Sequence, residues 1–350
     1  MRRISFFLAS ALLLALTAAH ARMWKEPDFG PRPVVAYPFS LGQAGAEMTT
    51  VVGTAHPYTI EKGDTLYDIA RLLGLGINEV EDALPDVDKW LPAEGETLRF
   101  PTWWVLPESD HKGVVINIPE MRLYYFPATR GGPPTVVTYA VGLGRDEWQT
   151  PTGRFKITEK TVNPTWVIPE SIREERIREK GRHEKLIAGG DPDNPLGRYR
   201  MRLTLPLYGI HGTNIAWGVG MQVSHGCVRL YPEDIERLFP IVPVGTPGEF
   251  VYQPVKVGTR HGRIYMEVHR AIYDDDFDYW NEARALFREK GWENHLDWGK
   301  VAAVIERKSG VPTRVSNGAP LATQQARGVS EAHTPEAHTR SGRKPTIVKN

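Results

Sequence analysis

The chain has a single cysteine, Cys227, among its 350 residues. An internal disulfide is therefore excluded, and the fold depends on an apolar core, for which this length is sufficient. The chain also lacks an excess of charge of either sign. Its formal net charge is +1, which argues against nucleic acid or another polyanion as a partner. Beyond the first 21 residues, no stretch is apolar over the roughly 20 positions that a membrane-spanning helix needs.

The N-terminus has the pattern of a secretory signal peptide, residues 1–21. Arg2 and Arg3 precede an apolar run at 4–16, and small residues follow as Ala19-His20-Ala21, so cleavage is expected after Ala21. The run is too short for a membrane anchor, and no cysteine lies near the cleavage site to carry a lipid. The mature chain is expected to be exported, without a transmembrane anchor.

In an exported protein, the state of the lone thiol of Cys227 needs an explanation. An exposed free thiol is a liability in an oxidising compartment, so Cys227 is either buried and inert or chemically used. The count of cysteines leaves both possibilities open.

The rest of the chain divides into five segments. Residues 22–55 are a leader rich in Pro, Gly and small residues. Residues 56–101 predict a compact strand-helix-helix-strand unit, with Asp64 capping the first helix. The stretches YTIEKGDTLYDIA and LPAEGETLRFP within it resemble a LysM module, which implies binding to the glycan of peptidoglycan; the alternative is a small packing domain that binds no glycan.

Residues 112–252 predict a mainly β domain, a β-sandwich or distorted barrel whose loops carry the chemistry. Six short runs of β-branched and aromatic residues alternate with Gly and Pro, and helices are expected at 169–180 and 232–239. Residues 253–315 predict a partly helical extension, with a strand at 263–269 and helices at 279–290 and 298–308. Residues 316–350 lack periodicity and predict a disordered tail.

The segment IHGTNIAWGVGMQVSHGCVRL places two histidines near Cys227. His211 lies 16 residues upstream (227 − 211) and His225 two residues upstream. A hairpin could fold His211 onto Cys227, where it would lower the pKa of the thiol and act as its base. A buried structural cysteine is one alternative. A zinc site made of His211, His225 and Cys227 is another, although its spacing matches no usual pattern and a fourth ligand is missing.

This segment resembles the signature of the L,D-transpeptidases of the YkuD type. The matching positions are an upstream His211-Gly212, then Ser224-His225-Gly226-Cys227, a hydrophobic residue and Arg229. Other similar stretches are VVINIPEMRLYYFP, the Thr-Pro-Thr-Gly at 150–153 and NPTW at 163–166, so the resemblance covers roughly residues 113–252. The order of a LysM-like unit followed by this domain is that of periplasmic members.

The resemblance implies a role for each site residue. Cys227 is the nucleophile and His211 its base, oriented by the backbone carbonyl of Gly212 or Thr213. His225 and the Gly226 and Cys227 amides shape the oxyanion site, Ser224 fixes the turn, and Arg229 with Gly212 contacts the substrate. For Arg229, holding a substrate carboxylate and forming a structural ion pair both remain open. No metal and no cofactor is implied.

The implied reaction is L,D-transpeptidation in cell wall biogenesis, with peptidoglycan as the partner. A cysteine thioester would form on the tetrapeptide stem and pass either to diaminopimelate, as a cross-link, or to a Braun-type outer-membrane lipoprotein. An L,D-carboxypeptidase, which uses water as acceptor, and a non-catalytic peptidoglycan-binding protein are the alternatives.

Overall fold

The computed structural model describes residues 33–42, 47–128, 131–318 and 321. The expected signal peptide at 1–21 and nearly all of the expected tail at 316–350 lie outside these ranges. Among the helices in the described ranges, none is both long and apolar enough to cross a bilayer.

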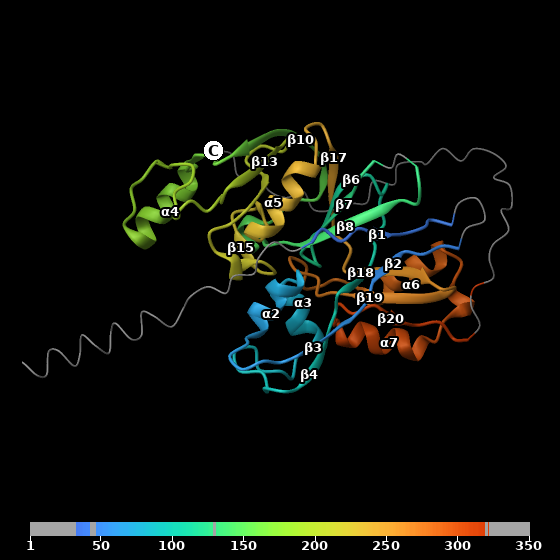
Figure 1. Cartoon of the computed structure of the whole chain (residues 1–350). Coiled ribbons are helices and arrows are strands. Elements are labelled where there is room, and N and C mark those ends of the chain that lie inside the picture. The colour runs from blue at the N-terminus through green and yellow to red at the C-terminus, as the bar shows by residue number, and fades with distance from the viewer. Residues whose placement is uncertain (1–32, 43–46, 129–130, 319–320, 322–350) are drawn as a thin grey trace, which may run out of the picture.

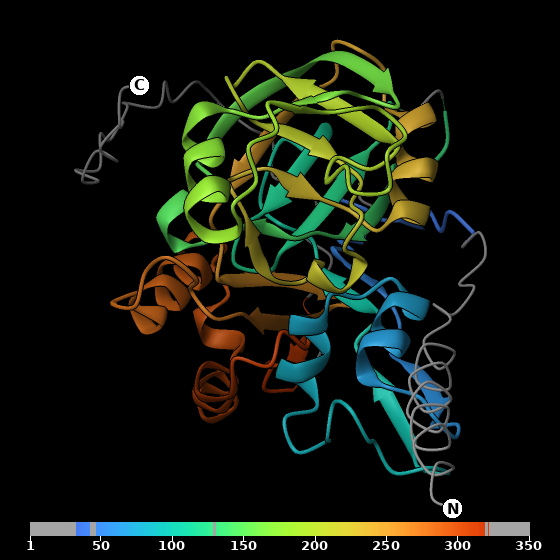
Figure 2. The ribbon, with the colours of Figure 1, turned by 90° about the vertical axis from the view of Figure 1, so that its left-hand side faces the viewer.

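A curled sheet of nine strands forms the upper half of the molecule in Figures 1 and 2. Its neighbours pair antiparallel except at β17–β6 and β14–β16, which are parallel. All six strands expected between 113 and 252 are present, so the mainly β architecture is confirmed. In spatial order the strands are β1 (Tyr37–Pro38), β8 (Thr135–Ala140), β7 (Arg122–Phe126), β6 (Gly113–Asn117), β17 (Pro247–Val251), β10 (Gly153–Val162), β13 (Tyr199–Leu203), β14 (Gly209–His211) and β16 (Val228–Arg229).

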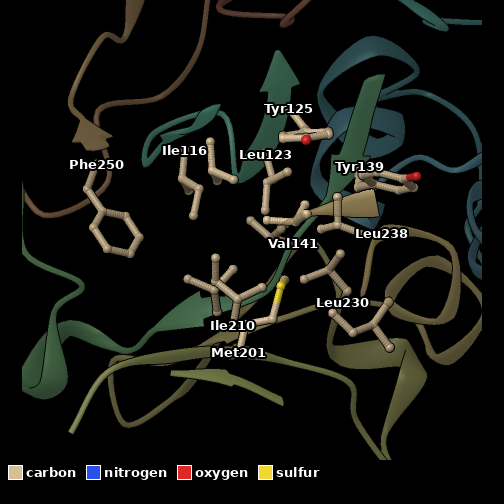
Figure 3. Close-up of a cluster of buried hydrophobic side chains, with 14 of the residues drawn as sticks. Ile116, Leu123, Tyr125, Tyr139, Val141, Met201, Ile210, Leu230, Leu238 and Phe250 are labelled. Carbon is tan, nitrogen blue, oxygen red and sulfur yellow. The ribbon is translucent and has the colours of Figure 1, made fainter. Parts of the chain in front are cut away.

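One face of this sheet packs on α5 (Pro232–Ile241) over the main apolar core. Pro232 occupies the first turn of α5, where its missing N–H costs no helical hydrogen bond. Ile210, within β14, and Leu230, directly after β16, are fully buried in this core. Figure 3 shows them with Met201 and Leu238. The backbone on either side of His211 and Arg229 is therefore anchored by apolar packing.

The unit at 56–101 has the expected order of elements: β3 (His56–Thr59), α2 (Leu66–Leu73), α3 (Ile77–Ala83) and β4 (Thr97–Phe100), with β3 and β4 antiparallel. The prediction that Asp64 caps α2 is wrong. Thr65 is the cap, since its hydroxyl accepts from the Asp68 N–H at 3.1 Å. Asp64 is engaged one turn earlier, where its carboxylate accepts from the Glu61 N–H and the Tyr58 hydroxyl.

This unit, called here the N-terminal module, shares a core with the nine-stranded sheet. Leu66, Ile69 and Phe100 of the module pack in one buried cluster with Val115 and Tyr124 of the sheet. The pair β2 (Val51–Gly53) and β5 (Trp103–Val105) continues this layer. In Figures 1 and 2 the module, in blue and cyan, lies against the sheet rather than apart from it.

A buried ion pair fastens the module to the sheet. The Arg122 guanidinium donates to the Glu79 carboxylate of α3 at 2.6 and 2.9 Å, and both side chains are almost inaccessible to water. Glu79 also accepts from Trp104 Nε1 and from the Gly76 N–H. At the rim, Arg71 of α2 pairs with Glu233 of α5 at 2.9 Å.

The segment after residue 252 forms a small layered unit. Its sheet consists of β18 (Val255–Arg260), β19 (Arg263–Val268) and β20 (Thr313–Arg314), covered by α6 (Tyr279–Glu289) and α7 (Trp298–Arg307), with a 3-10 turn, η4 (Glu293–His295), between the helices. The expected strand and both expected helices are present. Strand β18 was not expected, and it pairs with β19 along its full length.

Within the described residues, one group of three potential metal ligands comes together: Glu120, Glu267 and His269, all buried. The Lys256 ammonium lies 2.8 Å from Glu120 and 2.7 Å from Glu267. Because Lys256 already supplies the positive charge that these carboxylates need, the cluster is a structural network that joins β18 and β19 to the nine-stranded sheet.

The remaining elements lie around the loops at one end of the sheet. The helix α4 (Glu170–Lys180) is inserted between β11 (Trp166–Val167) and β12 (Leu186–Ile187), buries none of its residues, and projects from the sheet in Figure 1. The short elements are β9 (Leu143–Gly144), η2 (Asp146–Trp148), η3 (Ala216–Gly218) and β15 (Gln222–Ser224).

Candidate active site

Two neighbouring strands bring His211 and Cys227 together. His211 ends β14, Cys227 immediately precedes β16, and the register pairs Ile210 with Val228 and His211 with Arg229. The strands are parallel, so the expected hairpin is wrong. Residues 212–226 instead loop out through η3 and β15 and return in the same direction, which is why the motif needs a long spacing between its two halves.

The ring of His211 is buried and held in one tautomer. Its Nδ1 lies 2.6 Å from the carbonyl oxygen of Gly212, and because a carbonyl only accepts, Nδ1 carries the proton. This is one of the two carbonyl partners expected from the sequence. Burial, reinforced by the positive charge of Arg229, lowers the pKa of His211 to about 3. The imidazole is therefore neutral, and Nε2 carries the free lone pair.

The thiol of Cys227 is free and partly accessible. It donates to the carbonyl oxygen of Leu207 at 3.5 Å, and it forms no hydrogen bond with His211 in the described part of the chain. Burial raises the pKa of Cys227, although the Gly209 N–H and the charges of Arg200 and Arg229 act in the opposite direction. The expectation of a lowered thiol pKa is therefore wrong for this state.

The turn before Cys227 is fixed by Ser224, as expected. Its hydroxyl donates to the Cys227 carbonyl at 2.7 Å and accepts from the Gly226 N–H at 3.1 Å. The Gly226 and Cys227 amides were both expected to face a substrate carbonyl. Because the Gly226 N–H is already bonded within the turn, the Cys227 N–H is the remaining candidate for that role. Gly226 has φ 99°, and a Cβ there would lie 2.6 Å from the Tyr208 ring, so only glycine fits.

The side chain of His225 contacts α4 through Glu175. Its Nε2 lies 2.7 Å from the Glu175 carboxylate and 3.0 Å from the Arg145 guanidinium, and Trp148 packs edge-on against its ring. Burial lowers the pKa of His225, while Glu175 acts to raise it. The ring of His225 is thus held by Glu175 and Arg145, and its expected part in shaping the oxyanion site stays a prediction. Neither Glu175 nor Arg145 was found from the sequence, because each lies in a segment without a motif.

Three basic side chains form a row across adjacent strands. Arg200 of β13 is paired with His211, which is paired with Arg229, so the three share one face of the sheet. Across the described residues, neither arginine forms a salt bridge, and Nε of Arg229 is buried without a partner. The structural ion pair considered for Arg229 is therefore absent there. Arg200 was missed because the motif contains no position on β13.

Comparison with known proteins agrees with this arrangement. The sequence model of the YkuD family, described as the L,D-transpeptidase catalytic domain, matches residues 111–257. The chain is 34% identical over 328 residues to the probable L,D-transpeptidase ErfK/SrfK of Salmonella typhimurium, an alignment that covers 91% of this chain and 99% of that protein. The chain belongs to the L,D-transpeptidase family. A second relative, the probable L,D-transpeptidase YbiS of Escherichia coli, is 40% identical over 277 residues, or 76% of this chain and 89% of that protein.

Membership of the L,D-transpeptidase family confirms the resemblance carried by residues 211–229 and the expectation of an acyltransferase. The domain match itself begins at residue 111 and so says nothing about the N-terminal module, although the alignment with ErfK/SrfK covers 91% of the chain. The LysM assignment of residues 56–101 therefore stays a prediction.

Proposed function

We propose that this L,D-transpeptidase cleaves the bond between diaminopimelate and the terminal D-alanine of a peptidoglycan tetrapeptide stem, with Cys227 as nucleophile and His211 as base. The state of His211 carries the proposal. Its ring is buried, neutral and tied through Nδ1 to Gly212, which leaves the lone pair of Nε2 free beside the strand that presents the thiol. Gly212, expected to contact the substrate, has its carbonyl occupied in orienting the base.

The first half of the reaction transfers the stem to the enzyme. Sγ of Cys227 bonds to the carbonyl carbon of diaminopimelate while the thiol proton passes to Nε2 of His211. The C–N bond to D-alanine then breaks, and the same proton leaves with the amine. Since burial disfavours a charged His211, the imidazolium exists only while the adjacent oxyanion balances it.

The second half passes the stem to an amine. The acceptor nitrogen attacks the thioester, its proton moves through His211 to the departing sulfur, and the thiol is regenerated. The acceptor is the side-chain amine of a second diaminopimelate, which makes a cross-link, or a lysine of a Braun-type lipoprotein. The reaction takes place in the periplasm, which the N-terminal sequence at 1–21 supports.

Mass analysis of isolated muropeptides tests this reaction. Incubation with disaccharide-tetrapeptide is expected to give a dimer that has lost one D-alanine, and a lysine peptide in the mixture is expected to be acylated if it is the acceptor. Cys227→Ala is expected to abolish both products. Free tripeptide without dimer would make the enzyme an L,D-carboxypeptidase, and unchanged tetrapeptide would leave only a binding role.

The arginine row indicates how the donor is recognised. Arg200 and Arg229 flank His211 with no carboxylate of their own in the described structure, and a tetrapeptide stem carries carboxylates that a guanidinium can hold in a forked pair. Arg229→Lys keeps the charge but loses the fork. It is expected to raise KM for the stem at least tenfold while the melting temperature stays near that of the wild type. An equal loss of melting temperature and activity would assign Arg229 a structural role.

The N-terminal module offers a surface for glycan. Tyr67 and Trp90 stack with ring centroids 4.8 Å apart, and Trp90 is 56% exposed, a platform on which a sugar ring can lie. Trp90→Ala is expected to weaken binding to intact sacculi while turnover of a soluble stem is retained, because tethering raises only the effective concentration. Trp280→Ala, which removes an exposed tryptophan of α6, is the matched control. Equal binding by both variants would assign the module a packing role.

A further inference from the structure

The segment after β19 reaches back to the catalytic turn through Tyr273. The hydroxyl of Tyr273 donates to the carbonyl oxygen of Gly144 in β9. Strand β9 runs parallel to β15, the strand that leads into the turn, and the Arg145 N–H donates to the Ser224 carbonyl at 3.0 Å. A residue of the C-terminal segment thereby touches the strand on which the catalytic turn rests.

Gly144 packs directly on the residue before the nucleophile. A Cβ at Gly144 would lie 3.0 Å from the Cα of Gly226, so the two backbones are in contact. Thr150 adds a polar link, since its hydroxyl accepts from the Gly144 N–H at 3.1 Å and donates to the Gly226 carbonyl at 3.0 Å. Contacts therefore run without a break from Tyr273 through Gly144 and Thr150 to Gly226 and Cys227.

The backbone of Tyr273 has an unfavourable conformation. Its backbone has φ 72°, a left-handed conformation that a bulky residue seldom adopts unless its surroundings impose it. The preceding residue, Ile272, has its carbonyl bound by the hydroxyl of Tyr252 from the catalytic domain. Burial raises the pKa of Tyr273, so its hydroxyl remains a donor throughout the neutral range.

We propose that Tyr273 is a positioning residue of the transpeptidase, and that the C-terminal segment serves the reaction by holding Gly144, and through it the turn at 224–227, in place. The inference rests on the proposed role of Cys227 as nucleophile. It assigns a role in the reaction to a segment that lies mostly beyond the catalytic domain match at 111–257.

The test compares Tyr273→Phe with Tyr125→Phe. Both changes delete one hydroxyl and keep the ring. Tyr125 is a matched control because its hydroxyl donates to the Ile241 carbonyl at 2.8 Å, at the far end of α5. Three quantities are measured in each full-length variant: kcat and KM for the tetrapeptide, the rate of Cys227 alkylation by iodoacetamide as a function of pH, and the melting temperature.

Tyr273→Phe is expected to lower kcat about tenfold to a hundredfold with little change in KM, since a small misplacement of a reacting group costs this much. It is also expected to shift the pH profile of Cys227 alkylation, whereas Tyr125→Phe moves only the melting temperature. The inference is overturned if both variants keep kcat and the alkylation profile of the wild type. It is equally overturned if the loss in Tyr273→Phe merely follows its unfolded fraction. Retained transfer by Cys227→Ala would instead refute the proposed nucleophile, independently of either tyrosine.

Discussion

Removing the charge of Glu79 is expected to destabilise the N-terminal module and the catalytic sheet together. The Glu79 carboxylate is the acceptor for both contacts of the Arg122 guanidinium, for Trp104 Nε1 and for the Gly76 N–H. In Glu79→Gln the shape is kept, but Arg122 is left as an uncompensated charge with 0% of its side chain exposed. Breaking a buried pair in this way costs about 3–5 kcal/mol.

Urea denaturation, followed by tryptophan fluorescence and by circular dichroism, measures this effect. Because the module and the sheet share one core, we expect a single unfolding transition by both probes. The free energy of unfolding of Glu79→Gln is expected to be lower than that of the wild type by this amount. Asp110→Asn is the control: it breaks the Arg154–Asp110 pair, whose side chains are 80% and 70% exposed, and should change stability little. A loss below about 1 kcal/mol in Glu79→Gln, or separate transitions for the two parts, would refute the reasoning.

Three further outcomes follow from the site. His211 is neutral in the folded protein, with a pKa of about 3. Below about pH 6.5 the unfolded chain therefore binds one more proton than the folded protein, and stability falls as pH falls. His211→Gln should flatten this dependence of stability on pH, and an unchanged slope would contradict the prediction. Gly226→Ala should lose more stability than Gly245→Ala, because both have positive φ but only Gly226 faces the Tyr208 ring; equal losses would show that the ring yields. Burial raises the pKa of Cys227, so at mildly acidic pH it should alkylate more slowly than a model thiol, and faster labelling would indicate a preformed thiolate.

The direction of the thiol pKa bears on how the enzyme begins its reaction. Under the proposed mechanism, the lowered pKa of His211 and the raised pKa of Cys227 predict that the proton moves when the substrate arrives, rather than in a resting ion pair. Catalytic hydrogen bonds of this kind often tighten only in the complex with substrate. In that mechanism, Arg200 and Arg229, which flank His211, are predicted to stabilise the negative charge that develops on the sulfur or that the stem carries.

The sequence by itself determined the features that depend on neighbours along the chain. The alternation of apolar residues predicted the strands of the curled sheet, because side chains of a strand alternate between its two faces. The helical period at 66–73 predicted α2, and the motif at 224–229 indicated the nucleophile and the family. Such patterns act over a few residues and can be read without knowing the fold. The cap of α2 was misplaced by one residue because Asp and Thr are both good N-cap residues, and only the fold shows that Thr65 caps the helix while Asp64 accepts from the Glu61 N–H.

Tertiary structure decided everything that depends on residues distant in the sequence. Glu175 meets His225 across 50 positions, and Tyr273 meets Gly144 across 129, so no local pattern marks either contact. The parallel return of β16 beside β14 placed Arg200, His211 and Arg229 in one row. Burial, which exists only in the folded chain, set the direction of the pKa shifts of His211 and Cys227, because a charge is destabilised when water is removed from it.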